Sequence, residues 1–409
     1  MTSGLNPSAR RSDQAAAIQH SDSLTVRQQH GLLLSRRSLF KAALILGSGT
    51  AVGLAGCSTR ETQPTSGPRS SNADSPSTGS FDITDQKGRT VTFDRPVERI
   101  ATTVIPAPSM LIAADQGMDK LVAINKASKM QAKRGFLGEM FPELMKLPEA
   151  AAGNDFVPSI ETIAAQNPDV VIQWGHLGND IVAPIEQAGL ELLLILYGTQ
   201  EDLETWVSMF TKLVGKPERG QKILGNMHRD RKAVEEAVAK TKQRPRVVQI
   251  FNYDEMQVAG TDSYMDFGMT LAGGENVGTK AGSGSSIKVS KEELLSWNPE
   301  VVLIGNFSTA TPDAMYSDPF FADMDAVKNK RVYKIPNGGF AWDPPSNESN
   351  LMWQWTTSLL HPEVADFPLR DNMKKAYEFL YDHKLTDEQI DRILAVPANA
   401  QSKSYDRFR

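Results

Sequence analysis

The alternation of apolar and polar positions predicts an α/β body that begins near residue 81. Residues 81–85 and 89–93 alternate in polarity on either side of Lys87-Gly88, which is typical of a β-hairpin. Short apolar runs then alternate with segments of helical periodicity. Strands are expected at 99–104, 121–124, 170–174, 192–196, 246–251, 301–304 and 331–335, and helices at 109–116, 159–166, 181–188, 351–360 and 386–394. This alternation indicates mostly parallel sheets covered by helices.

An internal repeat predicts that the body consists of two similar lobes. The segment that starts at Ser159 resembles the one that starts at Ser290. Each has a serine, a short helix with a glutamate in its first turn, the sequence Asn-Pro-acid and an apolar strand. We expect both serines to be N-caps and both prolines to end the helix. The alternative is a coincidental match, since such helix–turn–strand units are common in α/β proteins.

A long helix is predicted between the two copies, over residues 217–242. This segment has no strand pattern, carries its apolar residues mostly on one helical face and begins with a proline, which suits a first turn. At 1.5 Å per residue it would span about 37 Å, enough to connect two lobes. We therefore expect an N-terminal lobe over 81–215, an inter-lobe helix over 216–242 and a C-terminal lobe over 243–409, with a ligand cleft between the lobes.

The first 80 residues have the pattern of a targeting segment. Arg36-Arg37 and Lys41 precede an apolar run over 42–54 that is shorter than the roughly 20 residues of a membrane span, and Ala55-Gly56-Cys57 follows. Residues 35–41 resemble a twin-arginine export motif, with the usual Phe-Leu order reversed, and 54–57 resemble a bacterial lipobox. We expect an export signal over 1–56, lipidation of Cys57 and a disordered tether over 57–80. The alternative is a short membrane helix beside a chance cysteine.

Composition narrows the range of functions. The 409 residues carry a formal charge of −5 and a single cysteine, so the chain has no internal disulfide and no thiolate metal cluster. The slight acidity argues against a nucleic-acid partner. The six histidines are scattered without metal-ligand spacing, which argues against a site for bare zinc or manganese. We expect no cofactor, and a preassembled metal complex suits the chain better as a ligand.

A series of short motifs, in order, gives the body a family resemblance. They are Ile83-Thr84-Asp85, Gly88-Arg89-Thr90-Val91-Thr92, Arg99-Ile100, Asn167-Pro168-Asp169, Ala272-Gly273-Gly274-Glu275-Asn276-Val277, Asn298-Pro299-Glu300, 326–333 and Leu360-His361-Pro362-Glu363. Their order resembles that of the iron-siderophore and cobalamin substrate-binding proteins of ABC importers, in which a rigid helix joins two lobes. The resemblance implies a monomeric, non-enzymatic receptor that delivers a metal chelate to a membrane permease. One departure is Pro108-Ser109-Met110, where members often have Thr-Glu.

Candidate ligand contacts follow the predicted strands, because ligands of open α/β sheets lie beyond the carboxyl ends of the strands. Aromatic side chains there offer flat apolar area with a polar edge, and a lysine suits an anionic chelate. The candidates are Pro108, Ser109, Lys126, Trp174, His176, Tyr253, Asn306, Phe340 and Trp342. His176 is also a weak candidate for a metal ligand. For each residue, the alternative is a position at the edge of the core or in solvent.

The resemblance also assigns Glu161 and Glu292 to docking on the permease, one glutamate from each lobe. A structural role is the alternative, because an acid in a first helical turn is favoured by the helix dipole and Glu293 completes a capping-box pattern with Ser290. The expected ligand is an iron-siderophore complex, with haem, a corrinoid or a molybdate-like oxyanion as alternatives. A different class, an exported lipoprotein hydrolase using His176 with Asp254 or Ser109, also stays open. We expect the protein to be exported and held by its lipid anchor alone, on the outer face of the cell membrane or on its periplasmic side.

Overall fold

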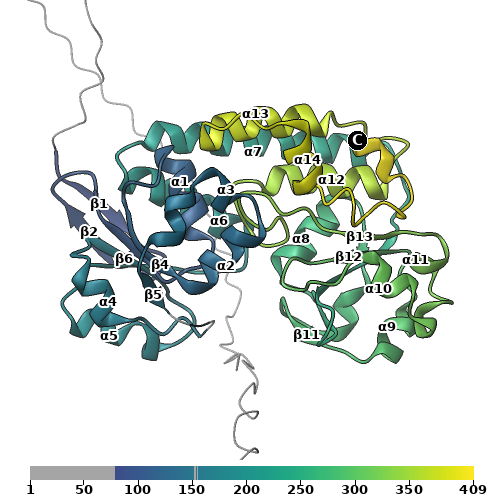
Figure 1. Ribbon diagram of the computed structural model, residues 1–409, viewed down its shortest axis with the longest axis horizontal. Helices are drawn as coiled ribbons and strands as arrows, with labels where there is room; N and C mark the ends of the chain where they lie inside the picture. The colour runs from purple at the N-terminus through teal and green to yellow at the C-terminus, as the bar shows by residue number, and fades with distance from the viewer. Residues whose placement is uncertain (1–78, 152, 154) are drawn as a thin grey trace, which may run out of the picture. The chain divides into compact units, whose positions relative to one another are not determined.

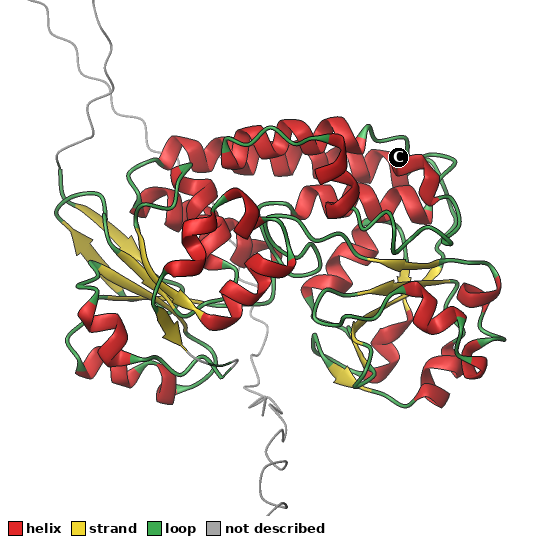
Figure 2. Ribbon diagram, viewed as in Figure 1, coloured by secondary structure: helices red, strands yellow, loops and turns green. Residues whose placement is uncertain are grey.

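The computed structural model describes residues 79–151, 153 and 155–409, so the predicted export signal and Cys57 lie outside the described residues. The described chain forms two α/β lobes, shown in Figures 1 and 2. None of the helices described has the length and hydropathy to cross a bilayer.

The N-terminal lobe contains a hairpin and a parallel sheet. The predicted hairpin is confirmed, with β1 (Phe81–Thr84) antiparallel to β2 (Thr90–Phe93). The sheet has the order β5-β4-β3-β6-β7 and all its neighbours are parallel. Its strands are β3 (Ile100–Thr102), β4 (Leu121–Asn125), β5 (Glu149–Ala151), β6 (Val170–Trp174) and β7 (Leu192–Ile195). The continuous burial of β4, β6 and β7 explains why they read as unbroken apolar runs.

Helices cover both faces of this sheet. Figure 1 places α4 and α5 on one side of it and α1 and α6 on the other. The helical segments are α1 (Ala107–Asp115), α2 (Lys126–Arg134), α3 (Leu137–Met140), η1 (Pro142–Lys146), α4 (Ile160–Ala165), η2 (Asn179–Ile181), α5 (Ala183–Gln187) and α6 (Gln200–Leu213). The sequence analysis missed α2, α3 and α6, although α6 begins with a complete capping box formed by Thr199 and Asp202.

The C-terminal lobe repeats the plan with a mixed sheet. Strands β8, β12 and β13 are parallel neighbours, and β9 pairs with β8 in the antiparallel sense. The strands are β8 (Arg246–Asn252), β9 (Gln257–Val258), β10 (Glu275–Asn276), β11 (Ile287–Lys288), β12 (Val301–Ile304) and β13 (Val332–Lys334). The helices are α8 (Tyr264–Leu271), η3 (Val277–Ala281), α9 (Lys291–Trp297), α10 (Pro312–Tyr316), η4 (Pro319–Phe321), α11 (Asp325–Lys328), α12 (Ser349–Leu360), α13 (Leu369–Tyr381), α14 (Asp387–Ile393) and η5 (Tyr405–Phe408). The predicted fold class, two lobes with mostly parallel sheets covered by helices, is thereby confirmed.

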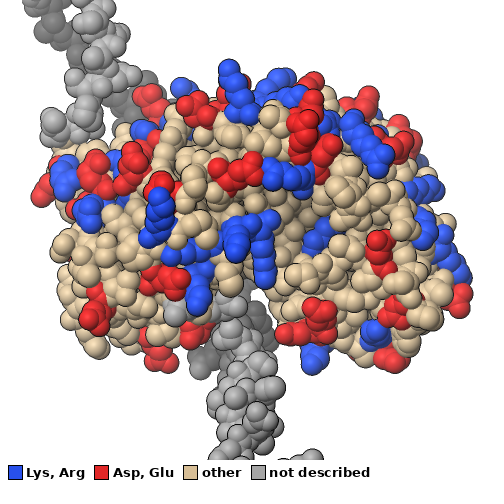
Figure 3. Space-filling view, viewed as in Figure 1, with Lys and Arg blue, Asp and Glu red and all other residues tan. Residues whose placement is uncertain are grey.

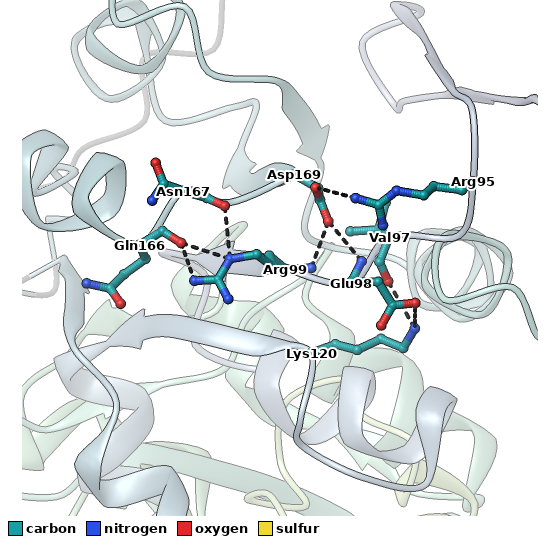
Figure 4. A network of polar contacts seen from close by, with 8 residues as sticks. All are labelled: Arg95, Val97, Glu98, Arg99, Lys120, Gln166, Asn167 and Asp169. Carbon is teal, nitrogen blue, oxygen red and sulfur yellow. Dashed lines mark hydrogen bonds and ion pairs between the residues drawn. The ribbon is translucent and has the colours of Figure 1, made fainter.

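Matching polar contacts hold the start of β3 in the N-terminal lobe and of β8 in the C-terminal lobe. In the N-terminal lobe, Arg99 Nε donates to the carbonyl oxygens of Gln166 and Asn167, at 3.0 Å each, just beyond α4 (Figure 4). The carboxylate of Asp169 accepts the backbone N–H groups of Glu98 and Arg99, both at 2.9 Å. These contacts tie the end of α4 to the start of β3.

The C-terminal lobe contains the same arrangement in its own residues. Arg246 Nε donates to the carbonyl oxygen of Asn298 at 3.1 Å, and Glu300 accepts the backbone N–H of Arg246 at 2.9 Å. The two asparagines, Asn167 and Asn298, share a left-handed backbone with φ of 45° and 43°. Contacts of this detail are not expected of a coincidental match, so the predicted repeat is a duplicated unit.

The helix starts of the two copies differ. Ser290 accepts from the backbone N–H of Glu293 while Glu293 accepts from that of Ser290, so the proposed capping box is present. Ser159 is the N-cap residue of α4, as predicted, but its side chain makes no capping bond. The backbone ψ of Ser159 is 79°, against 159° at Ser290, so the first copy enters its helix along a different path.

Helix α7 (Pro217–Val238) contacts elements of both lobes. Its 22 residues span about 33 Å and pack against α6 of the N-terminal lobe and α12 of the C-terminal lobe. Arg219, in its first turn, donates to the carbonyl oxygens of Ala113 in α1 and Phe379 in α13, at 2.6 Å each. Helix α13 also packs directly against α1. The lobes are therefore joined by α7 and by the C-terminal helix α13 together.

Candidate functional site

The N-terminal lobe presents an aromatic group at the carboxyl ends of β6 and β7. Trp174 ends β6 and packs edge-on against Tyr197, which follows β7, with ring centres 5.8 Å apart. Trp206 of α6 lies behind both rings, and its Nε1 donates to the carbonyl oxygen of Leu196 at 3.0 Å. Trp174 is only 5% exposed, so it packs beneath the surface, and the half-buried ring of Tyr197 forms the outer side of this aromatic group.

His176 lies on the outside of this aromatic group. Its ring meets Trp174 edge-on at 5.3 Å between centres. Partial burial lowers the pKa of His176, against the opposing charge of Asp202, so the imidazole is neutral near pH 7. Within the residues described, no three His, Cys, Asp or Glu side chains gather as a metal site. His176 can therefore accept or donate one hydrogen bond, without partners that would hold a bare ion.

The C-terminal lobe presents polar groups at the carboxyl ends of β12 and β13. Lys334, the last residue of β13, donates from Nζ to the carbonyl oxygens of Gly305 and Ser308, both at 2.7 Å. Burial lowers the pKa of Lys334 to about 8. Next to it, Asn306 donates from Nδ2 to Asp343 Oδ1 at 3.0 Å. This lobe thus presents a lysine and a carboxylate near its strand ends, together with the stacked rings of Phe251 and Phe307, whose centres lie 4.6 Å apart.

The two carboxyl edges approach each other. Burial, together with the nearby charge of Asp343, raises the pKa of Tyr197 in the N-terminal lobe, and Ser285 lies beside its hydroxyl; Asp343 and Ser285 both belong to the C-terminal lobe. Tyr264 donates from its hydroxyl to Gln200 Oε1 at 3.1 Å, again from lobe to lobe. The carboxyl edges of the two sheets therefore lie near each other, as the predicted cleft requires.

A second line of inter-lobe contact lies beside α2 and α3. The backbone N–H of Phe136 donates to the carbonyl oxygen of Gly338 at 2.6 Å, and Arg392 Nη2 pairs with Glu139 at 2.7 Å. A cavity of about 520 Å³ adjoins these contacts. Its lining residues are Ala132, Lys133, Arg134, Gly135, Phe136, Gly138, Glu139, Met145, Asn337, Arg392 and Ile393. This volume falls within the range of small-molecule pockets.

The structure places several of the predicted contacts in the interior. Pro108 and Ser109 are buried within α1, and Ser109 Oγ donates to the carbonyl oxygen of Pro106 at 2.9 Å. Phe340 is 5% exposed and Trp342 is fully buried. Trp342 Nε1 donates to Glu348 at 2.7 Å. Trp342 and Ser109 therefore belong to the cores of their lobes and offer a ligand no surface in this conformation, which corrects the expectation.

Other predicted contacts remain accessible or border the cleft. Lys126 is exposed at the first position of α2, and Tyr253 is half-buried with its hydroxyl 3.4 Å from the carbonyl oxygen of Ala314. Asn306, Trp174 and His176 lie at strand ends, as described above. Lys126 and His176 are thus exposed, whereas Trp174 and Asn306, at 5% and 6% exposed, are about as buried as Phe340.

Sequence reasoning missed Tyr197, Ser285, Lys334, Asp343 and Arg134. A signal was available for two of them, since Tyr197 and Lys334 come at the ends of apolar strands, where ligand contacts were expected. Arg134 ends a helix with no apolar periodicity, so nothing in the pattern marked it.

Glu161 and Glu292 are both exposed in the first turns of α4 and α9. They lie at equivalent positions of the duplicated unit. Glu293 alone completes the capping box with Ser290, so Glu292 is left accessible to a partner.

The chain is similar to known binding proteins over most of the described body. A family model described as "Periplasmic binding protein" matches residues 108–338. A solved periplasmic solute binding protein from Veillonella parvula is 30% identical, with a TM-score of 0.72 over 79% of this chain and 99% of that one. Molybdate-binding protein MolA from Haemophilus influenzae is 23% identical over 73% of this chain and 90% of its own length. Ferric enterobactin-binding periplasmic protein FepB from Escherichia coli is 25% identical over 64% of this chain and 85% of its own.

Proposed function

The chain belongs to the periplasmic binding protein family, and from that premise we propose that it is the exported substrate-binding component of an ABC importer, which captures a ferric chelate and passes it to a permease. The observation that supports this proposal is the pair of lobes whose strand ends lie near each other, with Trp174 and Tyr197 at the ends of one sheet and Asn306 and Lys334 at the ends of the other. Such a site suits a ligand with both apolar surface and polar edges.

We prefer chelate capture to catalysis because the candidate nucleophile has no base beside it among the residues described. A hydrolase would need a nucleophile near a base, and Ser109 Oγ donates to Pro106 rather than to His176. The ligand has alternatives. The relatives are named for molybdate, cobalamin, ferric enterobactin and iron(3+)-hydroxamate, so an oxyanion or a corrinoid stays possible, and haem is a third alternative. We prefer the ferric chelate because the half-buried ring of Tyr197 offers apolar contact and Lys334 offers charge.

A binding titration tests this function. Trp174 and Trp206 lie in the aromatic wall, so an iron chelate seated there quenches their fluorescence. The purified protein is titrated with a ferric tris-catecholate, a ferric trihydroxamate, haem, cobalamin and molybdate. Quenching and thermal stabilisation by an iron chelate support the proposal. No response to either chelate would refute it, and ester or phosphate turnover lost in His176→Ala would favour the hydrolase.

Docking on the permease is proposed for Glu161 and Glu292. One exposed carboxylate on each lobe gives a two-point electrostatic contact that sets orientation. The double variant Glu161→Gln and Glu292→Gln is expected to bind ligand normally and to lose uptake in cells. Glu293→Gln is unsuitable as a control because it breaks a cap, so Glu191→Gln, an exposed glutamate of the N-terminal lobe, serves instead.

Anchoring through a lipid on Cys57 is proposed from the sequence alone. Two acyl chains hold a protein stably at a membrane where one is marginal. Cys57→Ser is expected to release the protein into the soluble fraction, and incorporation of labelled palmitate into the unaltered chain measures the modification. Equal membrane association of both forms would refute the anchor.

A further inference from the structure

A second cavity lies between the helices that join the lobes. Its volume is about 290 Å³, close to the lower end of the range of small-molecule pockets. All its lining residues belong to α7, α12, α13 or the loop just before α12. Figure 1 shows α7 and α13 along one edge of the molecule, opposite α4 and α9. This cavity is therefore separate from the strand ends where the chelate site is proposed.

One part of the cavity lining is apolar. Ile223 and Met227 of α7 and Leu380 of α13 all line it, and each belongs to the buried core. Phe379 of α13 adds an aromatic ring, whose face is covered by the guanidinium of Arg219 at 4.7 Å. A ligand that fills the cavity must therefore bring some hydrocarbon surface to these side chains.

Another part of the lining consists of asparagine side chains whose oxygens are unused. Asn350 of α12 donates from Nδ2 to Asp230 Oδ2 at 2.6 Å. Asn372 of α13 donates from Nδ2 to Gln354 Oε1 at 2.7 Å. These bonds fix which way each amide faces, and the Oδ1 atoms of both asparagines accept no hydrogen bond from the residues described. The two amides therefore offer acceptors to a ligand.

A third asparagine, Asn347, lines the same cavity and is buried without a partner. Asn347 is 4% exposed, and its Oδ1 has no hydrogen-bond partner in the described part of the chain. Buried carbonyl oxygens in folded proteins are nearly always paired, because leaving one unpaired is costly. The next residue, Glu348, accepts three hydrogen bonds from buried side chains, which holds the backbone at Asn347 in place. A donor from a ligand would remove the cost of this unpaired oxygen.

The charges around the cavity do not favour an ion of either sign. Asp230 accepts from Arg229 Nε at 3.0 Å as well as from Asn350, so its two oxygens are already in use. Lys375, exposed on α13, adds one positive charge. Figure 3 shows Lys and Arg interspersed with Asp and Glu along this edge of the molecule. An anion would meet the unused carbonyl oxygens and a cation would meet Lys375, so an uncharged ligand suits the cavity best.

We propose that this cavity is a second binding site, for a small uncharged polyol of monosaccharide size, with hydroxyl groups on the asparagine oxygens and a C–H face on the apolar residues of α7. A hydroxyl group suits this lining because it donates to a carbonyl oxygen and accepts from a lysine. Ordered water satisfies the oxygens but brings no apolar face, and hydration alone is one outcome of the test. The site is additional to the proposed chelate site and does not depend on it.

Calorimetric titration of the purified protein tests this site. The probes are D-glucose, myo-inositol and glycerol, with inorganic phosphate and ethylammonium as charged comparisons. Asn347→Leu nearly keeps the side-chain volume and removes the oxygen, so it is expected to weaken polyol binding by about 10-fold, the effect of losing a hydrogen bond to a buried group. Ala376→Trp, in the cavity lining, is expected to abolish binding by filling the space. Asn329→Leu, at an exposed asparagine of the C-terminal lobe, is the matched control.

Each outcome supports or overturns the second site. Binding of a polyol that both cavity variants weaken and Asn329→Leu leaves unchanged supports it. The proposal is overturned if no polyol binds, which would mean hydration alone, if the variants bind polyol as tightly as the unaltered protein, or if a charged probe binds more tightly. Thermal unfolding checks Asn347→Leu, and Ala376→Trp decides if that variant unfolds early. Ferric chelate titrations of the same variants should match the unaltered protein, so failure of this site and failure of chelate capture are separate results.

Discussion

A buried carboxylate, Glu348, is expected to dominate the stability of the loop that borders the cleft. Glu348 is fully buried and accepts hydrogen bonds from Trp342 Nε1 at 2.7 Å, from the Tyr377 hydroxyl at 2.6 Å and from the Tyr381 hydroxyl at 2.7 Å. The Tyr377 hydroxyl in turn accepts the backbone N–H of Gly339 at 3.0 Å. This network ties the loop at 338–342 to helix α13.

Truncation to alanine leaves the three donors without an acceptor. A buried donor without a partner costs about 1–3 kcal/mol, and relaxation or entry of water recovers part of it. We expect Glu348→Ala to lower the free energy of unfolding by about 3–5 kcal/mol. Glu348→Gln keeps an oxygen for Trp342 and Tyr377 and faces Tyr381 with its amide, so its cost is expected to be about 1–2 kcal/mol.

Urea unfolding followed by fluorescence measures both variants. Glu388→Gln, an exposed glutamate on α14, is the control and should stay within about 0.5 kcal/mol of the unaltered protein. Burial raises the pKa of Glu348, so the fold binds its proton more tightly than the unfolded chain does. The stability of the unaltered protein relative to Glu348→Gln should then be greatest at acid pH and fall as pH rises through that raised pKa. Equal effects of Glu348→Ala and the control, or the opposite pH trend, would refute this account.

Two further outcomes are expected. Glu139→Gln removes an exposed inter-lobe ion pair and should cost less than about 1 kcal/mol in urea unfolding, so a larger loss would mean that this pair holds the lobes together. Arg99→Ala frees the end of α4 from β3 and should cost about 1–2 kcal/mol, and no change would show that Asp169 alone carries the contact.

The buried strands were predictable because a strand buried on both faces consists mostly of apolar residues, which the sequence shows directly. Strand β6 has the predicted bounds, since a run of apolar residues follows Pro168-Asp169 and burial on both faces leaves no alternation. Helix α2 was missed for the opposite reason. Its buried face consists of Ala127, Ser128, Gln131 and Ala132, which are small or polar, so no apolar period marks it.

Aromatic residues near strand ends could not be assigned from sequence. Trp174 is the last residue of an apolar strand and Trp342 comes after one, yet Trp174 packs beneath Tyr197 at the strand ends while Trp342 lies fully buried in the core. Trp342 is held in the core because its indole N–H donates to Glu348. Tyr377 and Tyr381, which are four residues apart on α13, donate to the same glutamate. Those partners are distant in sequence, and only the packing of α13 on the lobe reveals them.

The internal repeat explains which contacts could be predicted from the sequence and which could not. At the amino ends of the strands the copies keep one set of contacts, with Arg99 and Arg246 in the same role, so one copy predicts the other. At the carboxyl ends they differ, with Trp174 and Tyr197 in one lobe and Asn306 and Lys334 in the other. The proposed site lies at these ends, so its residues are the positions at which the copies diverge, which a repeat cannot predict.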